Sequence, residues 1–130
     1  MEDIKVNESK TVYTDHVGQV LCAAIIKNQY IATGSRDSLI HVYSLDGTKI
    51  ATLRGHSASI CTLCVINPKD PRPILASGGD SKCNSIVFWD TNTWTIRSKI
   101  QVHNAAVTTL ADCCDGQTMV SGSFDKKINV

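Results

Sequence analysis

The sequence predicts an all-β protein in which about three four-stranded antiparallel sheets follow one another along 130 residues. Three observations predict this class. Short apolar runs rich in β-branched residues are separated by turn residues about every ten positions. No segment shows the periodicity of a helix. A pattern of His, apolar run, Ser/Thr-Gly and Asp recurs three times, with His16, His56 and His103 separated by 40 and 47 residues.

The first unit covers residues 15–54 and contains four expected strands. Its apolar runs place them at residues 19–26, 30–35, 39–45 and 48–54. Asp46-Gly47 separates the last two strands, because this dipeptide accepts positive φ angles in a tight turn. Residues 8–14 lead into His16 as residues 48–54 lead into His56, and they predict an outer strand of a preceding unit.

The second unit covers residues 55–101 and is longer than the first. Its strands are expected at residues 59–66, 74–78, 85–90 and 95–101. The extra length falls in residues 67–73, which contain all three prolines and predict an exposed, stiff loop, and in the wider turn at residues 81–84. Surface-loop variation is the favoured interpretation of both insertions, and contact with a partner is the alternative.

The third unit covers residues 102–130, with strands expected at residues 106–112, 118–123 and 127–130. Asp115-Gly116 predicts the hairpin turn between the first two strands. Val130 is the last residue of the chain, one position before this unit would reach the aromatic residue that the other units carry.

Composition excludes several classes of function. The formal net charge is +1, and no basic run exceeds Lys126-Lys127, so we expect neither nucleic acid nor an anionic membrane surface as a partner. No apolar run approaches the length of a membrane span. The start of the chain at Met1–Lys5 is polar and lacks the apolar core of a signal peptide. We therefore expect a cytoplasmic protein, with a nuclear location as an alternative.

The six cysteines are expected to be reduced thiols in such a location. Cys61 and Cys64 have the spacing of zinc ligands, but residues three apart on a strand face opposite sides of the sheet. Core packing is thus the favoured role for Cys22, Cys61 and Cys64, and Cys113-Cys114 is expected to be inert. We expect no metal site and no cofactor.

The threefold pattern, completed by Trp89-Asp90 in the second unit, resembles the WD repeat of β-propeller proteins over nearly the whole chain. The resemblance implies three blades of an incomplete ring. It also implies a hydrogen-bonded network in each blade, in which an aromatic donor, a hydroxyl, a His and a turn Asp hold the strands together. The positions that match this network are His16, Thr33, Asp37 and Tyr43 in the first unit, His56, Ser77, Asp80 and Trp89 in the second, and His103, Ser121 and Asp125 in the third. Asp80 lies one place out of register because the turn after it is wider.

A Ser, a His and an Asp in one network also invite interpretation as a catalytic triad. The same trio recurs in every unit, and its hydroxyl lies within a strand rather than on an exposed, strained turn. The recurrence therefore favours a structural role, and we expect no catalytic residues.

Proteins that the chain resembles bind partners on one face, at positions defined by the repeat. These are the third and fifth residues after each His and the residue before each turn Asp. The fourth residue after the His (Val20, Ile60 or Val107) is expected to point into the core, so its neighbours point away from it. The candidate partner-binding positions are Gln19, Leu21, Arg36, Ser59, Cys61, Gly79, Ala106, Thr108 and Phe124. Arg36 and Phe124 are candidate interface anchors; the alternatives are a solvated charge for Arg36 and packing between blades for Phe124.

The resemblance predicts a non-catalytic scaffold that binds other proteins. The first alternative is an N-terminal fragment of a larger propeller-bearing protein whose catalytic or assembly function lies in absent parts. A second alternative is a thiol-dependent enzyme that uses Cys61 or Cys113. Because closed propellers have about four to eight blades, three blades are also expected to self-associate or to bind partner chains.

Overall fold

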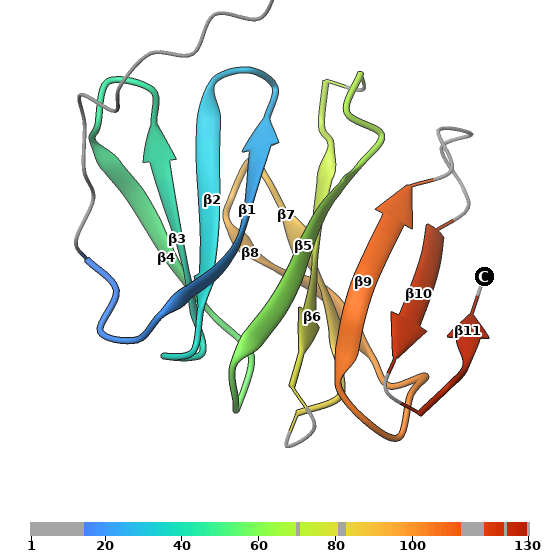
Figure 1. Ribbon diagram of the computed structural model, residues 1–130. Coiled ribbons are helices and arrows are strands. Elements are labelled where there is room, and N and C mark those ends of the chain that lie inside the picture. The colour runs from blue at the N-terminus through green and yellow to red at the C-terminus, as the bar shows by residue number, and fades with distance from the viewer. Residues whose placement is uncertain (1–14, 70, 81–82, 113–118, 124, 130) are drawn as a thin grey trace, which may run out of the picture.

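The computed structural model describes residues 15–69, 71–80, 83–112, 119–123 and 125–129. Figure 1 shows three antiparallel sheets side by side, in chain order from left to right, with the inner strands of adjacent sheets facing each other. In this part of the chain no helix is long and apolar enough to cross a membrane.

The first sheet is a meander of β1 (Val20–Ile26), β2 (Tyr30–Ser35), β3 (Leu39–Ser44) and β4 (Lys49–Arg54). Gly47 adopts a φ of 97° in the predicted turn before β4. A second tight turn joins β1 to β2 through Lys27 and Asn28, with φ angles of 54° and 55°. Two consecutive positive φ angles define a type I′ turn, whose twist matches the flanking strands.

The second sheet repeats this meander with β5 (Ile60–Ile66), β6 (Ile74–Gly79), β7 (Ile86–Asp90) and β8 (Thr95–Ile100). The third consists of β9 (Val107–Asp112), β10 (Met119–Ser123) and β11 (Ile128–Asn129). The predicted all-β fold of four-stranded units is therefore confirmed, and the sheets do not close into a ring. The expected strand at residues 8–14 and the Asp115-Gly116 turn lie outside the described residues.

The core lies between adjacent sheets. One cluster joins the first sheet to the second and includes Ile26, Ile40, Ile60 and Trp89. Another joins the second sheet to the third and includes Ile86 and Val107, among others. Each inner strand thus packs on the sheet before it, as blades do in a propeller.

One expectation about the core is wrong. Ile60 and Val107 are fully buried, but Val20, at the equivalent position of β1, is 54% exposed. The reason is that no described sheet packs against that side of β1, so the outward-facing Ile25 is also exposed.

Candidate functional site

A β-bulge at the start of each inner strand shapes the candidate site. The pairing register shifts between Val20 and Cys22, between Ile60 and Thr62, and between Val107 and Thr109. Leu21, Cys61 and Thr108 are the extra residues. A bulge residue is left out of the strand pairing, and its side chain changes direction. Three residues at equivalent repeat positions can therefore turn toward the same end of the sheets.

These three bulge residues line one hollow of about 360 Å³ that spans all three sheets. The hollow is lined by Leu21, Arg36, Ser59, Cys61, Asp80, Ala106 and Thr108. The structure thus brings together six of the nine candidate partner-binding positions. Asp80 joins them from the turn after β6, although the sequence analysis assigned it to the blade network.

The other three candidate positions lie elsewhere. Gln19 is exposed beside the hollow, where its carbonyl accepts a hydrogen bond from Arg36 N at 2.9 Å. Gly79 is buried, and a Cβ at this position would lie 2.8 Å from His56 Nδ1, so Gly79 serves packing within the sheet. Phe124 lies outside the described residues.

The hollow carries both signs of charge. Arg36 is exposed at one side, and Asp80 contributes a carboxylate from the second sheet. Burial raises the pKa of the Cys61 thiol, and the charge of Asp80 raises it further. The hollow therefore presents a cation, an anion, an apolar side chain, two hydroxyls and a protonated thiol, which is a surface suited to binding a polypeptide.

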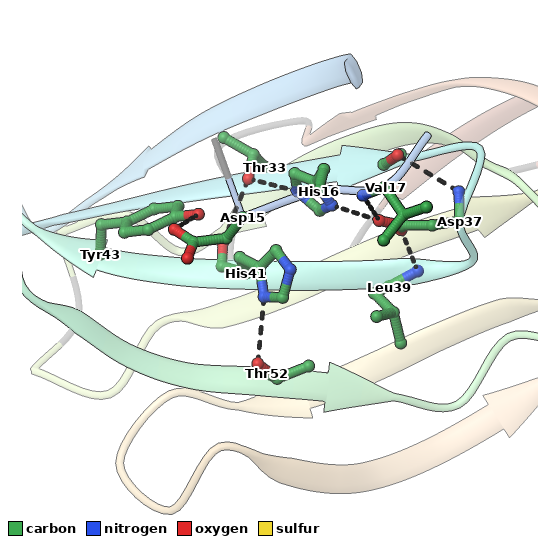
Figure 2. Close-up of polar contacts among 10 residues, drawn as sticks. Asp15, His16, Val17, Thr33, Asp37, Leu39, His41, Tyr43 and Thr52 are labelled. Atoms are coloured by element: carbon green, nitrogen blue, oxygen red, sulfur yellow. Dashed lines mark hydrogen bonds and ion pairs between the residues drawn. The ribbon is translucent and has the colours of Figure 1, made fainter. Parts of the chain in front are cut away.

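The network of the first sheet supports the Arg36 side of the hollow (Figure 2). His16 contacts Asp37 Oδ2 through Nδ1 and Thr33 Oγ1 through Nε2, both at 2.8 Å. The backbone N–H groups of Val17 and Leu39 also donate to the Asp37 carboxylate, at 3.1 and 2.9 Å. Burial acts to raise the pKa of Asp37, but these hydrogen bonds outweigh it and lower the pKa. The turn that carries Arg36 is thus held against the start of β1.

Tyr43 occupies the place of the expected aromatic donor, and its hydroxyl donates to Asp15 Oδ2 at 2.8 Å. The sequence analysis missed Asp15. Tyr at this position was a signal for a different partner, because the hydroxyl of a phenol lies further from the strand than the N–H of an indole.

The second sheet contains the predicted indole bond. Trp89 Nε1 donates to Ser77 Oγ at 2.8 Å, and Ser77 Oγ lies 2.6 Å from His56 Nε2. His56 Nδ1 meets Cys83 Sγ at 3.2 Å, at the place where the sequence analysis expected Asp80. The Asp80 carbonyl accepts from the backbone N–H groups of Cys83 and Asn84, and this inserted turn brings Cys83 to the imidazole. Burial lowers the pKa of His56 to about 4, and the charge of Lys99 contributes.

The third sheet repeats the arrangement of the first. His103 Nε2 lies 2.9 Å from Ser121 Oγ, and His103 Nδ1 lies 3.0 Å from Asp125 Oδ2. Ser77 and Ser121 are 0% and 2% exposed. A substrate cannot reach a hydroxyl buried to this degree, so the geometry argues against a catalytic triad in the second and third sheets.

Comparison with known proteins gives a consistent result. The family model described as "WD domain, G-beta repeat" matches residues 7–44, 47–90 and 94–130. The chain is similar to the "66 kDa stress protein" of Physarum polycephalum, with 34% identity over 77% of this chain and 16% of the relative. It is also similar to "p21-activated protein kinase-interacting protein 1-like" of Danio rerio, with 31% identity over 83% of this chain and 28% of the relative.

A solved structure shares the fold. The crystal structure of the RRP9 WD40 repeats matches 88% of this chain and 36% of its own chain, with a TM-score of 0.79 and 22% sequence identity. The chain therefore spans about a third or less of the proteins that it resembles.

Proposed function

This chain belongs to the WD domain, G-beta repeat family, and from that premise we propose that it is a non-catalytic scaffold that binds other proteins in the hollow at the ends of its inner strands. One observation carries the proposal. Equivalent bulge residues of all three repeats, Leu21, Cys61 and Thr108, line the same hollow. Each repeat contributes to the surface, whereas the buried His and Ser/Thr groups hold the strands that present it.

The chemistry of the hollow defines the partner. Leu21 offers an apolar contact and is 42% exposed, and Arg36 and Asp80 offer charges of opposite sign. Ser59 and Thr108 add hydroxyls. A loop or extended peptide that carries an apolar side chain between an acidic and a basic residue would match all of these groups. Arg is a common anchor of binding energy in such contacts.

The name of the Danio rerio relative, a p21-activated protein kinase-interacting protein, supports protein binding as the role of a related chain. It does not identify a partner for this one. The proposal for this chain therefore rests on the hollow and not on the partners of its relatives.

Substitutions in the hollow test the proposal. Leu21→Asp and Arg36→Glu are placed in the longest available reading frame, and co-purified proteins from cells are quantified by mass spectrometry. Arg54→Glu is the matched control, because Arg54 is exposed on β4 and does not line the hollow. We expect a specific set of proteins to be lost with both hollow variants and retained with the control. Equal partner sets for all three variants would contradict the proposal.

A second candidate is that the chain acts as part of a larger propeller-bearing protein, in which other parts carry a catalytic or assembly function. The exposure of Val20 and Ile25 favours it, because an inner strand of a closed propeller is covered on both sides. A further blade or a second copy of the chain would cover these residues. Light scattering of the isolated chain separates the cases, since a stable folded monomer at micromolar concentration would contradict self-association.

We also propose an intracellular location, cytoplasmic or nuclear. Cys22, Cys61 and Cys83 are free thiols in the structure, which fits a reducing compartment. Fluorescence microscopy of the tagged full-length protein tests this, and secretion into the medium would contradict it.

A further inference from the structure

His41 has a buried nitrogen that the blade network does not use. This residue lies in β3 and is 4% exposed. Its Nδ1 atom lies 3.0 Å from Thr52 Oγ1, but its Nε2 atom is buried without a hydrogen-bond partner in the described part of the chain. A buried polar atom without a partner is costly and calls for an explanation.

The position of His41 is specific to the first unit. In the strand pairing, His41 lies opposite Thr33, Val87 lies opposite Ser77, and Asn129 lies opposite Ser121. The second and third units therefore place no imidazole beside their network histidine at this register. An added His that leaves a buried nitrogen unpaired is difficult to explain as packing, because Val fills the equivalent position in the second sheet.

The unpaired nitrogen faces the His16 and Asp37 pair (Figure 2). The rings of His16 and His41 have centroids 4.2 Å apart. One ligand-type atom from each of His16, Asp37 and His41 lies within 4.8 Å of the other two. His16 and Asp37 come from the segment before β1 and the turn between β2 and β3, so three separate segments converge on one point.

We propose that His16, Asp37 and His41 form a binding site for a divalent transition-metal ion of the Zn²⁺ class. Two imidazole nitrogens and one carboxylate oxygen are a common protein ligand set for zinc, with water as the fourth ligand. Zinc–nitrogen and zinc–oxygen distances of about 2.0–2.1 Å place tetrahedral ligands about 3.3 Å apart. The distances between the ligand atoms must therefore shorten by about 1.5 Å at most. Small side-chain rotations achieve this.

The surroundings of the three ligands favour the metal-bound form. With its Nδ1 proton donated to Thr52 Oγ1, 3.0 Å away, His41 would keep on Nε2 the lone pair that a metal requires. With the ion on His16 Nδ1, the ring proton moves to Nε2 and donates to Thr33 Oγ1, which is already 2.8 Å away. The N–H groups of Val17 and Leu39 hold the Asp37 carboxylate in place. The ion would take the place of the His16–Asp37 hydrogen bond, and the unpaired nitrogen of His41 would gain a partner.

Charges of both signs lie near the site. His41 experiences the positive charges of His16 and Lys49 and the negative charges of Asp37 and Asp15. The carboxylate of Asp15 is held by Tyr43. A divalent ion would add positive charge where two carboxylates already lie close to the ring. Binding would tie the start of β1 to β3 and thereby stabilise the first sheet.

Metal titration of the 130-residue chain, stripped of metal, tests the proposal. Zn²⁺ binding is measured by calorimetry, and Co²⁺ is the spectroscopic probe because thiolate ligands produce a charge-transfer band that imidazole and carboxylate ligands do not. We expect one equivalent bound, no thiolate band and a higher melting temperature with metal. His41→Asn is the matched variant, since its amide keeps a donor toward Thr52 but lacks the second nitrogen. It should lose the binding and the metal-dependent melting shift.

Two further variants keep the test decisive. His41→Val copies the second sheet and should also lose metal binding while remaining folded by circular dichroism. Thr52→Val should weaken binding by about 10–100-fold, because it removes the group that orients His41. Wild-type affinity in the folded His41 variants, a thiolate band in the Co²⁺ spectrum, or no binding at micromolar metal by the folded chain would each overturn the proposal.

Discussion

The Cγ2 methyl of Ile60 lies 2.7 Å from the point that a Cβ atom on Gly34 would occupy. Ile60 begins the inner strand of the second sheet, and Gly34 lies in β2 of the first. The same relationship recurs one sheet further on, where Val107 Cγ1 lies 2.8 Å from the Cβ position of Gly78. The repeated Ser/Thr-Gly pair thus has two tasks. Its hydroxyl joins the network of its own sheet, and its glycine makes room for the next sheet.

Gly34→Ala and Gly78→Ala should therefore destabilise the fold. A methyl group at either position collides with a β-branched side chain that is fully buried, and overpacking of this kind costs about 1–3 kcal/mol. Gly122→Ala is the matched control, because the Cβ contact found there is with Thr109, within the same sheet. Urea unfolding followed by tryptophan fluorescence measures the difference. Equal destabilisation at all three glycines would contradict the proposed contact between sheets.

Much of this fold could be predicted from sequence because the relevant signals are local. The strands lie within about one or two residues of their expected bounds where they are described. The pairing of each His with a Ser or Thr could be expected from the repeat. What could not be predicted depends on how turns and neighbouring sheets place groups in space. The inserted turn that brings Cys83 to His56, the bulges that create the hollow, and the exposure of Val20 all have this origin.

His41, which the sequence analysis passed over, shows the same limit. Neither His41 nor Val87, its equivalent in the second sheet, belongs to the repeated pattern, so the sequence alone gives His41 no role. Its importance appears only when the turn that carries Asp37 and the segment that carries His16 are seen beside it (Figure 2).

Ser77→Ala should be among the more damaging single substitutions in the second sheet. The Ser77 hydroxyl accepts from Trp89 Nε1 and contacts His56 Nε2, and all three residues are buried. Its removal leaves two buried polar groups without this partner, each costing about 1–3 kcal/mol. Thermal and urea unfolding measure the loss. Ser98→Ala on the exposed strand β8 is the control and should change the free energy of unfolding by less than about 0.5 kcal/mol. A loss for Ser77→Ala no larger than that of the control would show that the network contributes little.

Stability should decline as the pH falls from about 6.5 toward 4. Burial, with the charge of Lys99, lowers the pKa of His56 from 6.5 to about 4 in the folded chain. Between these values the unfolded chain binds a proton that the folded chain does not, so acid favours unfolding. The full difference corresponds to roughly 3 kcal/mol.

Other groups also contribute to the pH dependence. Burial lowers the pKa of His41, which acts in the same direction. The lowered pKa values of Asp37 and Asp125 matter at lower pH, because their stabilisation is lost only as the pH falls below the usual range for Asp.

Urea unfolding at a series of pH values between 7.5 and 4.5 measures this dependence. His56→Gln is the test variant, because Gln keeps a polar side chain but does not titrate. It should flatten most of the pH dependence even if it lowers stability at neutral pH. A wild-type slope in this variant would assign the effect to other groups.

Cys22 should react slowly with alkylating reagents in the native chain. Burial raises the pKa of its thiol to about 11; a hydrogen bond from Gly34 acts against this, and nearby Cys61 adds to it. Because the thiolate is the reactive form, a pKa raised from 9.0 to about 11 lowers the rate by about 100-fold at neutral pH. Peptide mapping after brief treatment with iodoacetamide measures the alkylation rate of each thiol, and the same reaction in urea provides the unprotected rate.

Burial also raises the pKa of Cys61, so it too should react more slowly than an ordinary thiol. Native alkylation of Cys61 at or above the rate in urea would instead favour the thiol-dependent enzyme, because a catalytic cysteine must be ionised at neutral pH.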